Sequence, residues 1–436
     1  MFHRQLSVGI MSAPVIRFTL QGNYLLNSKP YSGYHTAEFC DGRIRFEGNT
    51  YDSLLFSGGD NFTLKDVTIG VNFHWERRED QTFRGDLLIL TGNDRVLHSE
   101  KGLVAINRID VEDYLVSVIS SEMSAQSSPE LLKAHAVISR SWLLHPLLNP
   151  EPDTSVKPSC TNDSDLLIRW YERDAHSLFD VCADDHCQRY QGITRQTSAN
   201  VQAAIDATRG IVLTSTTDGS VCDARFYKSC GGATELFENC WADRHYTYLE
   251  AVRDDVQASL PDLTDEQQAA QWIRTAPSAF CNTRDRRILQ QVLNNYDQET
   301  TDFYRWQVHY TQKELSQLVY ERSGIDFGTI QQLIPVRRGP SARLWQLKVV
   351  GTKHTLTVGK ELEIRKWLSK SHLYSSAFVV DKTTDADGTI RFTLTGAGWG
   401  HGVGLCQIGA AVMADKGYTW QQILAHYFPN TTLRKL

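Results

Sequence analysis

A glycine-rich stretch around one histidine is the part of this sequence whose residue types point most directly to a site. Residues 396–410 read GAGWGHGVGLCQIGA, with glycine at 396, 398, 400, 402, 404 and 409 around His401. Glycine loses more backbone entropy on folding than any other residue, so this density implies a tight backbone path or a ligand against the main chain. A turn that only packs against the following helix is the alternative. Gln407 stands where a dinucleotide-binding pattern needs glycine, and no Gly-Lys-Ser/Thr is present, so we expect no nucleotide site.

A glutamate at the end of an apolar helical pattern is the first candidate for acid–base chemistry. Glu122 stands beside Met123, on a short polar connection before the next helix. A carboxyl group held against apolar surface has a raised pKa and can act as a general acid near neutral pH. A solvated glutamate at a helix end is the alternative interpretation.

A cluster of histidine and cysteine is the candidate metal site. His176, Cys182, His186 and Cys187 place two imidazoles and two thiols within one short segment. Neutral imidazole and thiolate are the tetrahedral zinc ligands, and four protein ligands close the site to water. The spacing therefore predicts one structural zinc ion, with free cysteines as the alternative.

The turn Ser229-Cys230-Gly231-Gly232 forms a third group, with Lys228 and Glu235 as charged neighbours. Such a turn offers backbone amides and an approachable main chain to a ligand. Cys230 is also a candidate nucleophile together with the distant His401, as in thiol hydrolases. A packed, unreactive thiol is the alternative, because only Lys228 would lower the pKa of Cys230.

The elements that must position these groups can be read from hydrophobic periodicity and capping residues. Residues 1–108 show short alternating runs separated by Gly-Asn and Asp-Gly turns, which predicts strands. Asp110 is a candidate cap for a helix that ends near Glu122, and Ser128 with Pro129 announces a second helix. Lys133 and Arg140 share one face of that second helix.

Capping boxes begin two further helices, at Thr311 and at Thr419. We expect an α+β fold with four parts: a β-rich amino-terminal lobe (1–108), a core with the glutamate and the His/Cys cluster (109–253), a polar helical insertion (254–302) and a carboxy-terminal part with the glycine-rich stretch (303–436). The site is expected in a cleft between the lobe and the mixed helix-and-sheet region.

Composition excludes some classes of protein. The 436 residues carry a formal net charge of −6, which argues against a general nucleic-acid binder. No stretch has the apolar length of a transmembrane helix. The amino terminus lacks a sustained apolar segment, so no secretion signal is predicted. Nine cysteines are too sparse and too odd in number for a full disulfide framework.

Taken together, the ordered blocks resemble the SpoIID/LytB family of sporulation and cell-wall proteins. The blocks are Asp110-Val-Glu-Asp-Tyr-Leu, Ser121-Glu122-Met123, Leu132-Lys-Ala-His-Ala136, Ser229-Cys-Gly-Gly with Glu235 and Trp241, Gly400-His-Gly-Val-Gly-Leu-Cys-Gln-Ile-Gly-Ala410 and His426-Tyr-Phe-Pro429. The chain departs from the family where His135 replaces the usual glutamine, Cys230 and Cys406 replace serine, and Ile408 replaces an aromatic residue.

The resemblance implies a peptidoglycan lytic transglycosylase with Glu122 as the catalytic acid. It also implies a zinc ion near the cleft, held by His176, Cys182, His186 and Cys187. Action outside the cytoplasm, in the periplasm or cell envelope, is expected from the family. Because no export signal is visible, a cytoplasmic protein is the alternative. LytB-type members have been regarded as amidase enhancers, so a glycan-binding module that assists a cell-wall amidase is the alternative function.

The expected substrate contacts follow from these blocks. Positive side chains suit sugar or lactyl carboxylates, tryptophan faces suit sugar rings, and the glycine-rich wall turns its histidine and glutamine toward the sugar. The residues expected to bind substrate are Lys133, Arg140, Lys228, Ser229, Cys230, Glu235, Trp241, Trp399, His401 and Gln407.

Overall fold

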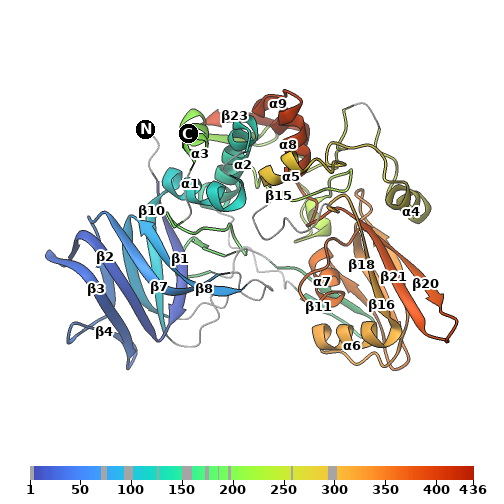
Figure 1. Ribbon diagram of the computed structural model, residues 1–436, viewed down its shortest axis with the longest axis horizontal. Coiled ribbons are helices and arrows are strands. Elements are labelled where there is room, and N and C mark those ends of the chain that lie inside the picture. The colour runs from blue at the N-terminus through green and yellow to red at the C-terminus, as the bar shows by residue number, and fades with distance from the viewer. Residues whose placement is uncertain are drawn as a thin grey trace. The chain divides into compact units, whose positions relative to one another are not determined.

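The computed structural model describes residues 4–69, 76–92, 102–124, 127–149, 160–171, 176–184, 186–194, 198–256, 259–292 and 302–436. The fold is α+β with a β-rich amino-terminal region, as predicted (Figure 1). The chain separates into two compact units. The first unit comprises Met1–Gln126, Arg173–Gly210 and Leu436, and the second comprises Ser127–Glu172 and Ile211–Lys435.

Two sheets dominate the first unit, and their strands are antiparallel except that the short β13 pairs with β1 in parallel. One has the order β13-β1-β10-β9-β6 and the other the order β5-β4-β3-β2-β7-β8. Alternate residues of β2, such as Phe18 and Leu20, are buried, as expected of a sheet with one face on the core. The strands are β1 (Gln5–Ala13), β2 (Val15–Leu26), β3 (Lys29–Cys40), β4 (Arg43–Phe46), β5 (Asn49–Tyr51), β6 (Ser53–Phe56), β7 (Asn61–Ile69), β8 (Arg77–Arg84), β9 (Asp86–Gly92), β10 (Gly102–Asp110) and β13 (Val181–Cys182).

Helix α1 (Val111–Glu122) continues directly from β10 in the first unit. The Asp110 side chain accepts a hydrogen bond from the Glu112 backbone N–H, which is the predicted cap. The apolar stripe of α1 is buried, and the helix packs against α3 (Ala199–Ala207). Because α1 has these partners, it belongs with the β-rich unit, whereas the sequence led us to expect a boundary at residue 108.

The second unit combines two larger sheets with helices. Their orders are β11-β12-β19-β18-β17 and β16-β21-β20, and α6 and α7 share a buried core with them. The elements are α2 (Pro129–Leu148), β11 (Cys160–Asn162), β12 (Leu166–Arg169), β14 (Ile211–Ser215), β15 (Phe226–Tyr227), α4 (Glu266–Thr275), α5 (Arg286–Val292), β16 (Arg305–Thr311), α6 (Gln312–Ser323), β17 (Ile330–Arg338), β18 (Leu344–Gly351), β19 (Thr355–Gly359), α7 (Glu361–Trp367), β20 (Phe378–Thr384), β21 (Ile390–Ala397), β22 (Leu405–Cys406), α8 (Gln407–Asp415), α9 (Trp420–Tyr427) and β23 (Thr431–Lys435), with a 3-10 turn at Phe237–Asn239.

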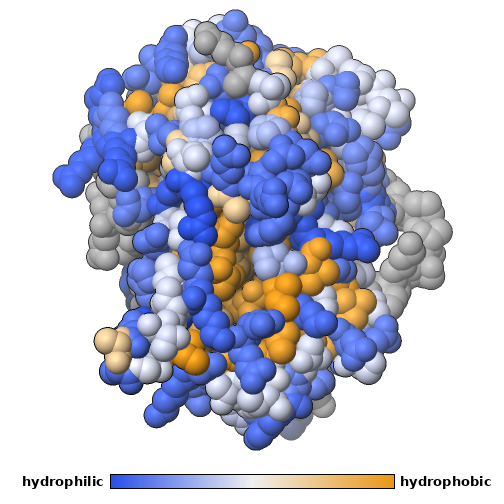
Figure 2. Space-filling model, turned by 90° about the vertical axis from the view of Figure 1, so that its right-hand side faces the viewer, coloured by the Kyte–Doolittle hydropathy of each residue, from blue (hydrophilic) through white to orange (hydrophobic). Residues whose placement is uncertain are grey.

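Both predicted capping boxes are present, at Thr311 before α6 and at Thr419 before α9. The predicted second helix is α2, with Ser128 as its cap and Pro129 in its first turn. Figure 2 shows the side of the molecule that carries β20, where hydrophobic side chains gather among hydrophilic ones. No helix in the ranges given above has the length and apolar character needed to cross a bilayer.

Candidate functional site

Glu122 is the last residue of α1, so a rigid and largely buried helix fixes its backbone. Its side chain is half-buried, and the next residue, Met123, is 2% exposed. The Arg189 backbone N–H lies 3.4 Å from Glu122 Oε1, which is long for a hydrogen bond. The helix therefore sets the position of the carboxyl group, and the Arg189 backbone N–H contacts it there.

The four predicted metal ligands lie together in the first unit. The ligand atoms of His176, Cys182, His186 and Cys187 are all within 4.8 Å of one another. Cys187 Sγ lies 3.5 Å from both His176 Nε2 and His186 Nδ1. Two imidazole nitrogens and two sulfurs are a donor set that suits tetrahedral zinc. We call these four residues the His/Cys cluster.

The segment that follows the His/Cys cluster runs along α1. Tyr114 of α1 donates its hydroxyl to Gln188 Oε1 at 3.3 Å, and the Gln191 backbone N–H donates to Ser117 Oγ at 3.2 Å. The contact from Arg189 to Glu122 lies between these two along the chain. The cluster and the glutamate are therefore joined by a short segment that is attached to the helix at several points.

The glycine-rich loop, residues 396–410, follows a tight backbone path in the second unit. Gly398, Gly400, Gly402 and Gly404 all have positive φ, between 75° and 98°. A Cβ at Gly398 would lie 2.7 Å from the Ser229 carbonyl oxygen, and one at Gly404 would lie 2.2 Å from the Arg225 carbonyl oxygen. Close backbone packing against residues 225–230 thus accounts for the glycines without a ligand.

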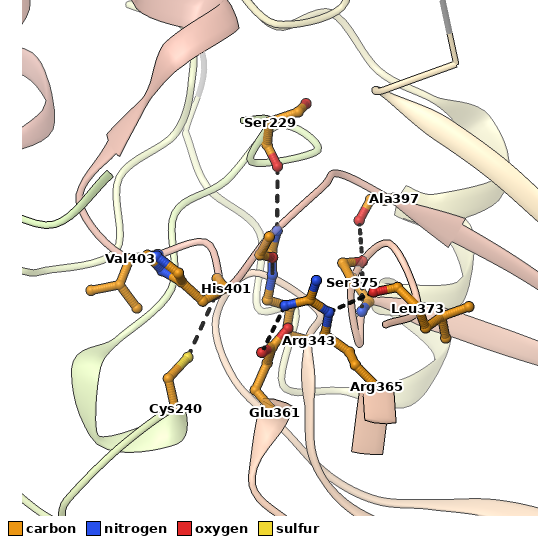
Figure 3. A network of polar contacts seen from close by, with 12 residues as sticks. Ser229, Cys240, Arg343, Glu361, Arg365, Leu373, Ser375, Ala397, His401 and Val403 are labelled. Carbon is orange, nitrogen blue, oxygen red and sulfur yellow. Dashed lines mark hydrogen bonds and ion pairs between the residues drawn. The ribbon is translucent and has the colours of Figure 1, made fainter. Parts of the chain in front are cut away.

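Arg343 holds this packing together, and no sequence pattern pointed to it. The side chain is 1% exposed. Its guanidinium donates to the carbonyl oxygens of Gly400 at 3.1 Å, Cys230 at 3.1 Å and Ser229 at 3.4 Å. Nearby, Arg365 reaches Glu361 and the Leu373 carbonyl oxygen (Figure 3). An arginine of this kind is recognised only when the carbonyl groups around it are known.

His401 is fixed by its neighbours in the same network. Its Nδ1 accepts the Val403 backbone N–H at 3.1 Å, and its ring packs edge-on against Tyr227 and Trp241. The Cys240 thiol points at the His401 carbonyl oxygen (Figure 3). Burial holds the pKa of His401 well below its usual range, followed in weight by the charge of Arg225. The imidazole is therefore neutral at physiological pH.

Half of the predicted substrate contacts are buried, which corrects that expectation. Arg140 donates to the Ile211 carbonyl oxygen at 2.9 Å, and Gln407 lies 3.2 Å from His135 Nε2. A side chain without exposed surface cannot lie against a glycan, so these residues shape the fold. The buried ones, at most 2% exposed, are Arg140, Ser229, Cys230, Glu235 and Gln407. The partly exposed ones are Lys133, Lys228, Trp241, Trp399 and His401.

Burial also contradicts Cys230 as a nucleophile. The residue is 1% exposed, and burial raises the pKa of its thiol well above the ordinary value. A protonated, enclosed thiol cannot attack a polysaccharide or a peptide. That the glycine-rich loop faces Glu122 across a cleft stays a prediction, because the two belong to different units.

Comparison with known proteins points to sporulation and the cell wall. Residues 99–215 match the family described as Stage II sporulation protein, and residues 235–404 match a domain of unknown function, DUF8618. The chain is 24% identical to the Stage II sporulation protein D of Bacillus amyloliquefaciens over 328 residues, which is 74% of each protein. It is 22% identical to that of Bacillus subtilis (strain 168) over 334 residues, 76% of each. It is 25% identical to the Amidase enhancer of the same strain over 329 residues, 73% of this chain and 40% of the relative.

Proposed function

Since the chain belongs to the SpoIID/LytB family, whose members are associated with the cell wall, we propose that it is a lytic transglycosylase of peptidoglycan. The bond cleaved is the β-1,4 bond between N-acetylmuramic acid and N-acetylglucosamine. The observation that carries the proposal is Glu122, a half-buried carboxyl group at the end of a rigid helix, contacted by the segment that follows the His/Cys cluster.

Glu122 acts as both acid and base in this mechanism. Its carboxyl group protonates the glycosidic oxygen as positive charge develops at the anomeric carbon of the muramic acid. The ionised carboxylate then takes the proton of the muramic 6-hydroxyl, whose oxygen attacks the anomeric carbon and closes a 1,6-anhydro ring. One carboxyl group suffices because the nucleophile belongs to the substrate, unlike the two-carboxylate arrangement of most glycoside hydrolases.

The His/Cys cluster is proposed to hold one zinc ion. Four protein ligands leave no open position for water or substrate, so the ion has a structural role. Its effect on this chain is to fix residues 186–191, which contact Tyr114, Ser117 and Glu122 of α1. An ion held there would support the position of the carboxyl group, and the proton transfers need only Glu122.

The partly exposed residues are the proposed glycan contacts. Trp241 has the Arg225 guanidinium over its ring at 3.8 Å, and Trp399 packs against Tyr374 and Phe303. Lys228, which donates to the Val292 carbonyl oxygen, and Lys133, which is paired with Glu130, are the proposed contacts for the carboxylates of the lactyl groups. The proposed activity also requires that the protein acts where peptidoglycan is, outside the cytoplasm.

Purified glycan strands without stem peptides provide the direct test. Wild-type protein is expected to release fragments that end in 1,6-anhydro-muramic acid, identified by mass spectrometry, and Glu122→Gln is expected to release none. Products with reducing ends would show hydrolysis instead, and anhydro products from Glu122→Gln at the wild-type rate would exclude this glutamate.

The similarity to an amidase enhancer supports a second candidate, a glycan-binding protein that assists a cell-wall amidase. This function requires no acid, so Glu122→Gln would stimulate an added amidase as well as the wild type does. Release of stem peptides from whole cell walls, with and without each variant, separates the two functions.

A further inference from the structure

Three cysteines and one aspartate meet in the interior of the second unit, apart from the His/Cys cluster. The ligand atoms of Cys230, Asp254, Cys281 and Cys406 all lie within 4.8 Å of one another, and Cys230 Sγ is 3.4 Å from Cys281 Sγ. All four residues are at most 1% exposed. We propose that this Cys/Asp cluster is a second structural zinc site, which holds the glycine-rich loop to the turn at residues 229–232.

The donor set and its spacing suit this ion. Thiolates and a carboxylate are zinc ligands, and soft thiolate disfavours magnesium and calcium. A tetrahedron with zinc–sulfur bonds of about 2.3 Å has sulfur–sulfur edges of about 3.8 Å. The observed 3.4 Å between Cys230 and Cys281 is near that edge and far above the length of about 2.0 Å of a disulfide bond.

The cluster differs from three thiols that merely pack together, because the carboxyl group of Asp254 is buried with them. Its Oδ1 accepts the Tyr427 hydroxyl at 2.6 Å and its Oδ2 accepts the Cys281 backbone N–H at 2.8 Å. Among the residues that the structure describes, no lysine, arginine or histidine forms an ion pair with this carboxylate. A buried carboxyl group is ionised only beside a counter-charge, and each of its oxygens keeps a second lone pair for a ligand. A cation among the three sulfurs would supply that charge.

Backbone N–H groups point at two of the sulfurs and would support their thiolate forms once a metal is bound. The Gly232 backbone N–H donates to Cys230 Sγ at 3.3 Å, and the Gly409 backbone N–H donates to Cys406 Sγ at 3.4 Å. Such bonds favour the charged form of an acceptor. Zinc with three thiolates and one carboxylate has a net charge of about −2. Arg305 and Arg343 place guanidinium groups 3.0 Å from the Gly231 carbonyl oxygen and 3.1 Å from the Cys230 carbonyl oxygen, which offsets this charge.

The positions of the ligands define what the ion does. Cys230 follows β15, Cys406 ends β22 and caps α8, and Asp254 and Cys281 come from the segment between them. The glycine-rich loop contributes both Cys406 and Gly409. A metal here joins four stretches of chain that are distant in sequence, and binding is coupled to folding because the unfolded chain holds no such site.

The inference is tested by the metal content of the 436-residue chain, measured by plasma mass spectrometry after purification without added metal. We expect about two zinc ions per chain, one for each cluster. Cys182→Ser should remove one and Cys281→Ser or Cys406→Ser the other. Cys222→Ser is the matched control, because Cys222 is equally buried but belongs to neither cluster, and it should keep both.

A second measurement keeps the test decisive where a serine variant fails to fold. The Cys182→Ser protein is refolded with Co²⁺ alone, and intense thiolate-to-cobalt absorption in the near ultraviolet is expected from the Cys/Asp cluster. The inference is overturned if the Cys182→Ser protein contains no zinc as purified and shows no such absorption after refolding with Co²⁺. It is also overturned if alkylation under denaturing conditions finds Cys230 and Cys281 joined as a disulfide. Neither result depends on glycan cleavage, so the proposed function can fail or hold separately.

Discussion

Replacement of Glu122 by glutamine separates chemistry from stability more cleanly than any other change in this protein. The amide keeps the shape of the side chain and loses the proton that must be transferred. The carboxyl group is half-buried, and its contact with the Arg189 backbone N–H is 3.4 Å long. The amide oxygen of glutamine can still accept this N–H, so the substitution keeps a hydrogen-bond acceptor at the same place.

The two expected effects differ in size. Loss of general acid–base catalysis lowers the turnover rate by about 10²- to 10⁴-fold. At about 1.4 kcal/mol per tenfold change, this is roughly 3–5 kcal/mol of transition-state stabilisation. One neutral hydrogen bond contributes about 1 kcal/mol of folding free energy, and glutamine keeps the shape and an acceptor oxygen of the side chain. For a domain of 150–250 residues, loss of that whole amount lowers the melting temperature by about 2–4 °C.

Glu112 is the matched control, because it lies on the same helix. Its carboxylate is 2% exposed, stands in the first turn of α1 and accepts the Gly210 backbone N–H at 3.1 Å. Glu112→Gln removes a charge that favours the helix start and is expected to lower the melting temperature while turnover per folded molecule is unchanged. Anhydro-muramic ends are counted over time at equal concentrations of folded protein. If both variants lose turnover in proportion to their melting temperatures, Glu122 is only a structural residue.

Three further predictions concern Cys182 of the His/Cys cluster, the buried His135, and Gly409 of the glycine-rich loop. Cys182→Ala should lower the melting temperature and the zinc content by one ion together; unchanged zinc content contradicts the proposed ligand set. His135 is fully buried, and burial lowers its pKa to about 3, so the unfolded chain binds a proton below about pH 6.5 that the folded chain does not. The free energy of unfolding therefore decreases as pH falls. In His135→Gln this decrease should be smaller by about 1.4 kcal/mol per pH unit between pH 6 and 4, measured by urea titration. Equal slopes for the variant and the wild type would contradict this prediction. Gly409→Ala would place Cβ 2.1 Å from the Tyr427 hydroxyl oxygen, so it should cost about 1–3 kcal/mol in urea denaturation, whereas an unhindered helical site would gain about 1 kcal/mol.

The parts of this protein that the sequence predicted best are those set by local rules. The caps at Asp110, Ser128, Thr311 and Thr419 depend only on a side chain and the backbone N–H groups that follow it, and all four are present. The His/Cys cluster is also local, since its members lie within one short segment. A spacing of this kind brings the ligands together with few demands on the rest of the fold.

The errors came where burial depends on partners far away in the chain. A polar residue in a family block can contact a substrate or support the backbone, and only the tertiary structure separates the two. Arg140 and Gln407 both proved to be bonded within the second unit, to the Ile211 carbonyl oxygen and to His135. The same limit hid Arg343, whose partners are carbonyl groups of the glycine-rich loop and of the turn at Ser229.

The Cys/Asp cluster shows a different limit, because its four residues have no spacing in common and reach one point only through the fold. Two of them, Cys230 and Cys406, stand where the family commonly has serine. A buried serine is a good hydrogen-bond partner and a poor zinc ligand, so the two cysteines supply half of the ligands of the proposed metal site. The sequence predicted that the glycine-rich loop faces a ligand. In the structure, Gly398 of this loop lies against the backbone of Ser229 and Cys230, and the Cys230 backbone N–H donates to Cys406 Sγ. In each unit, a group of soft ligands stands next to a segment that contacts a proposed site residue or contains one: residues 186–191 contact Glu122 in the first unit, and the glycine-rich loop contains His401 in the second.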